Sequence, residues 1–330
     1  MNYRDLPWRS TKDPFRIWLS EIILQQTRVV QGLPYYEKFI QRFENVYEFA
    51  DASESEILKL WQGLGYYSRA RNMHTCASEV VTNYDGRFPD NYIELLKLKG
   101  IGKYTAAAIA SICFNEKIPV IDGNVYRVIS RLFGLSNDIS SSQSYQIFFD
   151  AMLQLMPEEN CGDFNQSVME LGATICSPSS PSCDRCPIST FCFAYAKNTQ
   201  LNYPVKTKKV KISARKLDYH ILQHKNMLLM SLRSKKDIWK GLHEFFLVEN
   251  ENNLKLPFSG YLEKQSEVTT HQLTHQKLSI QFHRWNVSID IFDMMQKKFN
   301  MKSIDISEIG NFAVPKPIEL FLKNENLLVN

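Results

Sequence analysis

Four of the seven cysteines fall within residues 176–192, and this cluster limits the possible folds more than any other feature of the chain. The cysteines are spaced as Cys176-x6-Cys183-x2-Cys186-x5-Cys192, with several Ser and Pro residues between them. Ser and Pro form loops readily, so one short segment can wrap four thiolates around a metal. Four thiolates can satisfy a tetrahedral zinc ion or a cubane iron–sulfur cluster, and the spacing alone leaves both open. The competing interpretation is four reduced cysteines without a metal, which is unusual at this density.

The remaining composition is that of a globular protein with a mildly basic charge. The 330 residues are 44% hydrophobic and 22% charged, and the formal net charge is +4. This length favours two domains, and the charge is compatible with a nucleic-acid partner without requiring one. No apolar stretch is long enough to span a bilayer and the N-terminus has no secretory signal, so we expect a cytoplasmic protein with no membrane partner. In that reducing compartment, cysteines are metal ligands or free thiols more often than disulfides.

Hydrophobic periodicity predicts that residues 1–197 form a nearly all-α domain. The first strong helix is expected over 16–31, which contains neither Gly nor Pro. Further helices are expected around 35–43, 54–61, 66–83, 91–98, 103–114, 124–133, 143–155 and 164–175. Residues 198–216 carry several Lys and Arg residues and no acid, which indicates a solvated basic linker that could also touch phosphates. Alternation with a period of two over 278–289, and a similar pattern over 217–230, predicts that 217–330 form a smaller α+β domain.

The segment 98–106, with the sequence LKGIGKYTA, predicts a tight turn between two helices. Gly100 and Gly102 allow the turn to leave backbone N–H groups exposed, and the second helix presents the positive end of its dipole. Such a turn can bind a nucleic-acid phosphate without reading a base. The alternative is a plain helix–helix turn. Lys103 and the Ala-rich segment 105–110 favour the phosphate-binding interpretation.

Two carboxylates stand among residues that should desolvate or fix them. Glu21 lies inside the expected first helix with apolar neighbours at helical spacing, and burial there would raise its pKa and suit a general acid. Asp122 follows the apolar run 118–121, where it could cap a helix or act as a fixed anion near a developing cation. Two carboxylates that flank a glycosidic bond are the usual means of cutting it. The plain alternatives are a surface Glu and an ordinary helix cap, and the composition leaves these open.

Several motifs occur together in an order that resembles one known family. They are the helix WLSEIILQQT at 18–27, the run GLGYYSRARN at 63–72, the turn at 98–106, IDGNV at 121–125 and the four cysteines. In this order and at these intervals they resemble the MutY family of adenine DNA glycosylases, within the helix-hairpin-helix superfamily. The resemblance implies two domains. One is an all-α helix-hairpin-helix glycosylase domain with an iron–sulfur cluster loop, and the other is an α+β Nudix-like C-terminal domain.

The resemblance also implies a function, a cofactor and a partner. The protein would be a monofunctional DNA N-glycosylase of base excision repair. It would hydrolyse the N-glycosidic bond of adenine mispaired with 8-oxoguanine or guanine and leave an apurinic site. Its partner would be double-stranded DNA containing an adenine mismatch, bound by a monomer. The four cysteines would hold one [4Fe–4S] cluster, which favours iron–sulfur over zinc, and this cluster would shape a DNA-contacting loop rather than catalyse the reaction.

Carried over residue by residue, the resemblance gives the catalytic residues distinct roles. Glu21 would protonate adenine N7 and help to activate water. Asp122 would stabilise the oxocarbenium-like sugar, Asn124 would orient the groups around Asp122, and Tyr104 would support the sugar intermediate. The adenine pocket would be lined by five further residues: Arg4, Leu6, Trp8, Arg9 and Gln166. The DNA contacts would come from Gln26 and Tyr66, which enter the duplex near the lesion, and from the hairpin residues Gly100, Gly102 and Lys103.

The C-terminal part also resembles the family. Residues 238–246, IWKGLHEFF, are similar to part of the Nudix-like domain that recognises 8-oxoguanine. No Glu-rich Nudix metal motif follows them, so this domain should recognise rather than hydrolyse. The family's lesion-reading motif is Phe-Ser-His, and the matching residues here are Leu273, Thr274 and His275. Thr274 keeps the hydroxyl of Ser, whereas Leu273 loses an aromatic contact, and an ordinary turn at a strand end is the alternative interpretation.

Two other functions fit parts of the sequence. A pyrimidine glycosylase and AP lyase of the endonuclease III type shares the hairpin, the Asp and the cysteines, but it uses a hairpin lysine as its nucleophile where this chain has Tyr104. Lys103 lies one residue earlier, about 100° around a helix, so we expect base removal by water with little strand cleavage. The third hypothesis is a non-catalytic DNA-binding metalloprotein. It predicts that Glu21→Gln leaves every activity unchanged.

Overall fold

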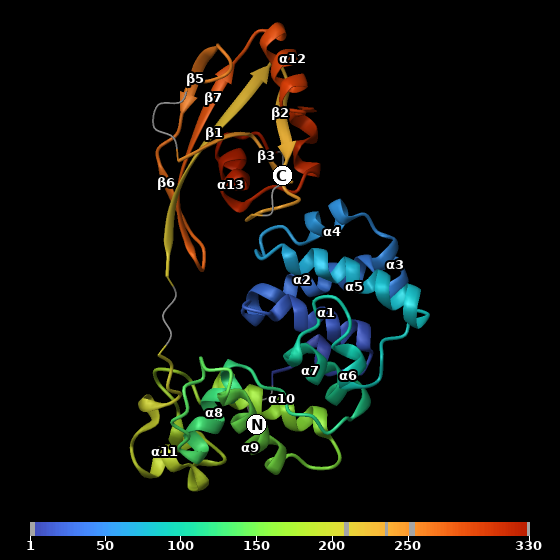
Figure 1. The fold of residues 1–330 in the computed structure, drawn as a ribbon, viewed down its shortest axis with the longest axis vertical. Coiled ribbons are helices and arrows are strands. Elements are labelled where there is room, and N and C mark those ends of the chain that lie inside the picture. The colour runs from blue at the N-terminus through green and yellow to red at the C-terminus, as the bar shows by residue number, and fades with distance from the viewer. Residues whose placement is uncertain (1–3, 208–210, 235–236, 251–254, 329–330) are drawn as a thin grey trace. The chain divides into compact units, whose positions relative to one another are not determined.

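The computed structural model describes residues 4–207, 211–234, 237–250 and 255–328, and packing divides the chain into two compact units (Figure 1). The first unit comprises Met1–Asp51 with Asn72–Lys208, and the second comprises Ala52–Arg71 with Lys209–Asn330. The second unit is therefore discontinuous in sequence. The expected boundaries at 197 and 217 stay predictions, and Lys208 and Lys209 of the expected linker lie outside the described residues.

The described part of the first unit is helical, as the periodicity predicts. Its α-helices are α1 (Pro14–Leu24), α2 (Val29–Arg42), α3 (Val46–Asp51), α5 (Ser68–Tyr84), α6 (Tyr92–Leu95), α7 (Lys103–Phe114), α8 (Gly123–Phe133), α9 (Ser144–Leu155), α10 (Cys161–Thr174) and α11 (Phe193–Ala196). The first four residues of α5 belong to the second unit. Short 3-10 turns occur at Pro7–Arg9, Cys183–Arg185, Ser189–Phe191 and Gln200–Asn202. No helix of the described residues is long and apolar enough to cross a membrane.

Helix α1 begins as the sequence predicts but ends earlier. Asp13 caps it by accepting a 3.0 Å hydrogen bond from the backbone N–H of Phe15, and Pro14 occupies the first turn. The single helix expected over 16–31 is wrong, because α1 stops at Leu24 and α2 starts at Val29. Gln26 between them has a left-handed backbone, with φ 55°, which costs a non-glycine residue about 1–2 kcal/mol. The break leaves the Gln26 side chain exposed.

The turn between α6 and α7 forms the predicted hairpin. Gly100 has φ 79°, and a Cβ atom there would lie 2.7 Å from the Cβ atom of Asn72, so only glycine fits this turn without a shift. Gly102 is the N-cap of α7. The small residues that follow are buried, and α7 packs against α1 and α10. A Cβ atom at Gly162 of α10 would come within 2.6 Å of the Ile112 backbone, so these two helices approach closely.

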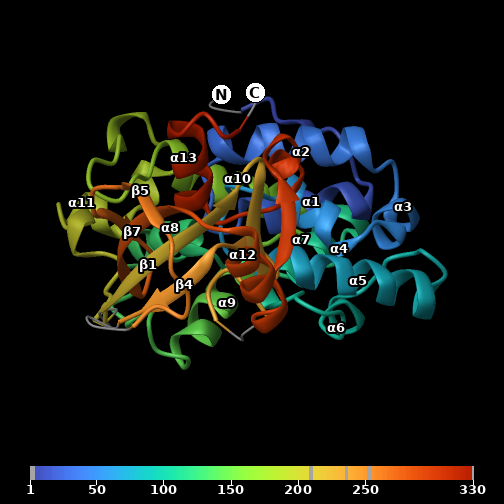
Figure 2. The same ribbon diagram turned by 90° about the horizontal axis from the view of Figure 1, so that it is seen from above.

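The second unit is built on a mixed eight-stranded sheet, visible in Figures 1 and 2. Its strands are β1 (Ser213–His224), β2 (Met227–Leu232), β3 (His243–Glu244), β4 (Phe246–Glu249), β5 (Tyr261–Gln265), β6 (Thr269–Gln272), β7 (Gln276–Asn286) and β8 (Lys302–Asp305). Its helices are α4 (Glu54–Leu60), α12 (Ile289–Lys298) and α13 (Lys316–Asn324), with a 3-10 turn at Ile306–Asn311. The central path runs β3-β2-β1-β7-β5. Strands β1 and β7 are parallel, with Ser213 opposite Gln276, and the other pairs are antiparallel.

Both faces of the central strands are covered, which explains why residues 217–222 of β1 are all buried. Tyr219 belongs to one core cluster together with Phe321 of α13. Leu222 belongs to a second cluster together with Phe292 of α12. Parallel strand pairs are typically buried on both faces in this way. The expected division into an all-α unit and an α+β unit is confirmed.

Candidate active site

One cavity of about 520 Å³ in the first unit brings the predicted catalytic residues together. Glu21 comes from α1, Tyr104 from the first turn of α7, Asp122 from the residue that precedes α8, and Asn124 from the first turn of α8. These residues are up to 103 positions apart in sequence. They become neighbours because α1 packs on α7, and α10 packs on both α7 and α8. The five residues predicted for the adenine pocket also line this cavity: Arg4, Leu6, Trp8, Arg9 and Gln166.

Glu21 has the environment that the sequence predicts for a general acid. Its side chain is buried, with 8% of the residue exposed. Burial and the nearby charge of Asp122 together raise the pKa of Glu21 to about 7, while the neighbouring Tyr104 hydroxyl opposes the shift. The same hydroxyl donates to Sδ of Met169 at 3.6 Å. Burial beside the same carboxylates raises the pKa of Tyr104 as well, so its hydroxyl stays protonated and can donate. A carboxyl group with a pKa near neutrality can hold and release a proton under the conditions of the reaction.

Asp122 is fixed by hydrogen bonds from α8. As the N-cap of this helix it accepts from the backbone N–H of Val125 at 2.7 Å, and its other oxygen accepts from Nδ2 of Asn124 at 2.8 Å. Burial raises the pKa of Asp122, and these donors together with the charge of Arg127 oppose that shift. Asp122 is therefore held in one orientation at the N-terminus of a helix, where a carboxylate is stabilised by the helix dipole.

A buried arginine that the sequence analysis missed holds Asn124. Arg127 donates from Nη2 to Oδ1 of Asn124 at 2.8 Å and to the Gly172 carbonyl at 2.6 Å. Its Nε donates to the carbonyl of Cys176 at 2.6 Å. The signal that could have found it is its position three residues after Asn124 on the same helix, where the two side chains lie on one face.

Glu170 is the second residue that the sequence analysis missed. Its carboxylate accepts from Nε and Nη2 of Arg4 at 2.7 and 2.6 Å and from Nη2 of Arg9 at 2.6 Å. Burial would raise the pKa of Glu170, but the hydrogen bonds from the two arginines outweigh it and lower the pKa. Gln166, Met169 and Glu170 lie on one face of α10 and all line the cavity, and this helical spacing could have revealed the carboxylate.

The four clustered cysteines lie around one small cavity in the first unit, together with Arg131. All four are free thiols. Arg131 is 1% exposed and donates from Nη1 to Sγ of Cys176 at 3.3 Å, and Gln200 donates to Sγ of Cys183 at 3.7 Å. Within the described ranges, no three side chains of His, Cys, Asp or Glu are arranged to hold a single metal ion. The cavity nevertheless combines four thiols with N–H donors, the partners that thiolate ligands accept from.

The predicted DNA-contacting residues do not line the cavity that contains Glu21 and Asp122. Gln26 is exposed beside it, and Lys103 points at the ring of Tyr145, with Nζ 4.4 Å from the ring centre. Gly100 and Gly102 form the hairpin turn. In the second unit, the hydroxyl of Tyr66 is hydrogen-bonded to that of Thr274, and both residues are exposed, as is His275. Two residues predicted from separate motifs to meet the lesion are therefore in direct contact.

Comparisons with known proteins agree with both units. The family of HhH-GPD superfamily base excision DNA repair proteins matches residues 19–151, and the NUDIX domain family matches 219–324. An adenine DNA glycosylase of Buchnera aphidicola subsp. Schizaphis graminum is 31% identical over 97% of this chain and 94% of its own length. The human adenine DNA glycosylase is 41% identical over 58% of this chain and 37% of its own.

Among solved structures, a thermostable thymine-DNA glycosylase is similar to this chain. The two are 34% identical with a TM-score of 0.53, over 59% of this chain and 89% of the other. The near full-length match to a curated relative, together with Glu21, Tyr104 and Asp122 in one cavity, leads to a single conclusion. The chain belongs to the adenine DNA glycosylase family of base excision repair.

Proposed function

We propose that this adenine DNA glycosylase acts on adenine paired with 8-oxoguanine or guanine and hydrolyses its N-glycosidic bond without cutting the strand. The observation that carries the proposal is Glu21, a buried acid with a pKa of about 7, in the same cavity as the fixed carboxylate of Asp122. A proton donor and a fixed anion together meet the two needs of N-glycoside cleavage, which are a neutral leaving group and a stabilised sugar cation.

The proposed reaction proceeds in two steps within this cavity. The protonated carboxyl of Glu21 gives its proton to N7 of the flipped adenine, the bond between C1′ and N9 breaks, and its electron pair leaves with the base. The sugar becomes an oxocarbenium-like cation, which the carboxylate of Asp122 stabilises and can bond to transiently. Water then adds to C1′ and returns a proton to the Glu21 carboxylate. The products are adenine and an apurinic site.

Other residues around the cavity would position the two reacting partners. Tyr104 would support the sugar and donate to Glu21, and Asn124 would keep Asp122 oriented, in agreement with its 2.8 Å hydrogen bond. Arg4, Leu6, Trp8, Arg9 and Gln166 would enclose the base. Gln26 would fill the space that the flipped adenine leaves in the duplex.

The four cysteines would hold one [4Fe–4S] cluster. The support is the donor set, because four free thiols ring one cavity and two of them accept N–H hydrogen bonds. When bound, the cluster would supply structural cross-linking of the loop 176–192 and no chemistry at the base. Arg131 would contribute by fixing the loop through the carbonyls of Ser177 and Pro178 as well.

The second unit would read the base opposite adenine. Thr274 and His275 stand exposed at the turn between β6 and β7, and Tyr66 contacts Thr274. No observation favours a lyase of the endonuclease III type. The hairpin residue that lines the cavity is Tyr104, and the neighbouring Lys103 lies over Tyr145.

The test is single-turnover cleavage of end-labelled duplexes that carry adenine opposite 8-oxoguanine, guanine or thymine. Each reaction is split, and one half is heated in alkali. We expect alkali-dependent breaks at adenine opposite 8-oxoguanine and guanine only, and we expect Glu21→Gln to abolish them. Breaks without alkali would show a lyase and make Lys103 the next residue to replace. Full activity of Glu21→Gln would exclude the assigned acid.

A further inference from the structure

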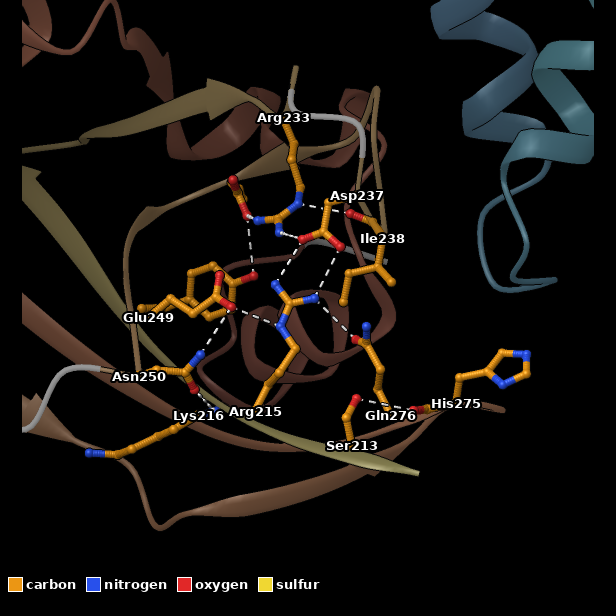
Figure 3. Close-up of polar contacts among 12 residues, drawn as sticks. Ser213, Arg215, Lys216, Arg233, Asp237, Ile238, Glu249, Asn250, His275 and Gln276 are labelled. Atoms are coloured by element: carbon orange, nitrogen blue, oxygen red, sulfur yellow. Dashed lines mark hydrogen bonds and ion pairs between the residues drawn. The ribbon is translucent and has the colours of Figure 1, made fainter. Parts of the chain in front are cut away.

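One guanidinium at the start of β1 ties together three segments of the second unit (Figure 3). Arg215 donates from Nη1 and Nη2 to the two oxygens of Asp237 at 3.0 and 2.8 Å. Its Nε donates to Glu249 of β4 at 2.8 Å, and Nη1 also donates to the side-chain oxygen of Gln276 at 3.1 Å. The Arg215 side chain is only 13% exposed. A planar fork with three acceptors fixes the directions of all three, which a lysine ammonium cannot do.

Asp237 shares its carboxylate with a second, more deeply buried arginine. Arg233 donates to Asp237 at 2.7 Å and to Glu244 at 2.6 Å, and its Nε binds the Ile238 carbonyl at 2.8 Å. Its side chain is 4% exposed. These contacts fix the described residues that follow Asp237, including Trp239, whose left-handed backbone has φ 60°. Through Asp237, Arg215 is therefore connected to a segment that buried hydrogen bonds and ion pairs hold in place, and not to a solvated loop.

The third segment held by Arg215 is the turn that carries Thr274 and His275. Gln276 closes this turn, because its carbonyl accepts from the N–H of Leu273 at 2.8 Å. Ser213 holds the His275 carbonyl with its backbone N–H at 3.0 Å and its hydroxyl at 3.2 Å. In Figure 3 the His275 ring points away from the network, so the anchored backbone leaves the tip free to meet another molecule.

The same turn meets the Trp239 segment on its other side. The rings of Trp239 and His271, at the end of β6, lie 6.1 Å apart, and Leu273 packs against the core cluster that Trp239 also contacts. Through Gln276, the Arg215–Asp237 pair thus joins the segment at Asp237 to the β7 side of the turn. The Trp239–His271 ring pair joins the same segment to the β6 side. Contacts on both sides of the turn therefore set the position of its exposed tip.

We propose that Arg215 is a positioning residue that sets the selectivity for the base opposite adenine, acting through Gln276 on the turn of Thr274 and His275. The inference rests on the proposed lesion-reading role of this turn. Arg215 does not touch the DNA and takes no part in bond breaking. Its loss should therefore weaken recognition of 8-oxoguanine while the rate of the bound complex stays the same.

The experiment compares the full-length variants Arg215→Lys, Gln276→Ala and Thr274→Ala with the unmodified protein. Gln276→Ala removes only the hydrogen bond between Arg215 and the turn, and leaves both ion pairs of Asp237 in place. The proposal can therefore still be tested with this variant if Arg215→Lys does not fold. Arg284→Lys is the matched control. Arg284 is an arginine of the same sheet that binds Glu263 and Gln223 instead of the turn.

The measurements are the enzyme concentration that gives half-maximal single-turnover rate, and the maximal rate, for adenine opposite 8-oxoguanine and opposite guanine. We expect Arg215→Lys and Gln276→Ala to raise the half-saturating concentration for the 8-oxoguanine duplex by about ten-fold, as expected when one well-placed contact is lost. The guanine duplex and both maximal rates should change less than about two-fold. Arg284→Lys should behave as the unmodified protein does.

A double-mutant cycle distinguishes an effect of Arg215 on selectivity that acts through the turn from an effect that acts independently of it. If Arg215 acts through this turn, Arg215→Lys combined with Thr274→Ala should lose no more selectivity than Thr274→Ala alone. Additive losses would overturn the proposal. Unchanged selectivity in Thr274→Ala would refute lesion reading by this turn and the inference with it. A loss in Thr274→Ala, with wild-type selectivity in Arg215→Lys and Gln276→Ala, would overturn only the inference.

Discussion

Arg127 donates a 2.6 Å hydrogen bond to the carbonyl of Cys176. This one side chain therefore links the cysteine cluster to the residues that hold Asp122. The other end of the same guanidinium binds Asn124 at 2.8 Å, and Asn124 in turn binds Asp122 at 2.8 Å. The cavity that contains Asp122 and the cysteine loop are thus connected through α8. This connection predicts that the geometry of Asp122 depends on a residue that never contacts the DNA base.

Replacement of Arg127 should slow adenine removal. Arg127→Lys keeps the charge but cannot serve Asn124 and Cys176 together, so we expect the single-turnover rate constant to fall by about 10–100-fold, the equivalent of one or two lost hydrogen bonds of a charged group. The control is Arg185→Lys, an exposed arginine of the cysteine loop. Rapid-quench assays at saturating enzyme would measure the effect. A normal rate in Arg127→Lys, with a slow rate in Asn124→Ala, would contradict the proposed connection.

The rate of adenine removal should decrease as the pH rises through about 7. Glu21 must carry a proton to donate it, and burial raises its pKa to about 7, so the active form dominates below that pH and falls ten-fold per unit above it. Single-turnover rate constants at saturating enzyme, from about pH 5 to about pH 9, would show this alkaline limb. A flat profile over that range would mean that another group supplies the proton.

Tyr104→Phe should move the alkaline limb to higher pH. The Tyr104 hydroxyl lies close enough to the Glu21 carboxylate to lower its pKa, so removal of this hydroxyl lets burial raise the pKa further. The maximal rate should also fall, because the sugar loses a supporting group. Tyr126→Phe, a tyrosine of α8 outside the cavity, is the control. A limb that stays in place, or moves to lower pH, would show that the hydrogen bond does not stabilise the ionised acid.

Glu170→Gln should weaken DNA binding and lower stability. The substitution removes the Glu170 carboxylate that pairs with the guanidinium of Arg9, at a cost of about 1–3 kcal/mol, or roughly 5 °C in melting temperature. Arg4 and Arg9 would lose their common anchor beside the adenine pocket, so the half-saturating DNA concentration should rise more than the maximal rate falls. Glu158→Gln breaks a largely exposed pair with Lys117 and should change neither quantity. Equal effects of the two variants would argue against an anchoring role.

The purified protein should contain about four iron atoms per chain, as a [4Fe–4S] cluster requires. Cys192→Ser should lose iron and the visible absorption of the cluster, whereas Cys113→Ser should keep both, because Cys113 lies outside the cysteine loop. Metal analysis of anaerobically purified protein would measure the content. One zinc per chain would instead identify a structural zinc site.

The sequence predicts those parts of the site that lie in local motifs. Glu21, Tyr104 and Asp122 each stand in a short segment with its own helix, hairpin or cap pattern, and the family resemblance links them. The partners of Glu170 lie 161 and 166 residues away, and no pattern near α10 indicates them. Arg215 likewise binds groups from β4, β7 and the segment at Asp237, so its role depends on the topology of the sheet.

The expected helix over 16–31 shows a second limit of prediction from the sequence, which concerns where a helix ends. This segment contains neither Gly nor Pro, and nothing in the composition indicates an end at Leu24. The break is set by the backbone of Gln25 and Gln26, which turns the chain so that α2 can pack on α1. Tertiary packing overrides a local preference here, because propensities differ by less than the energy of burying a helix face.

The discontinuous second unit constrains the order in which the protein can form. Ala52–Arg71 packs with residues that begin at Lys209, through contacts such as Lys59 with the Phe312 carbonyl and Gln62 with the Val314 N–H. During synthesis this early segment leaves the ribosome long before its partners exist. The first unit therefore has to mature around an unfinished insertion. The first unit reaches its final state only after the last third of the chain has been made. A premature stop after the cysteine loop would therefore leave Ala52–Arg71 without the surface it packs on.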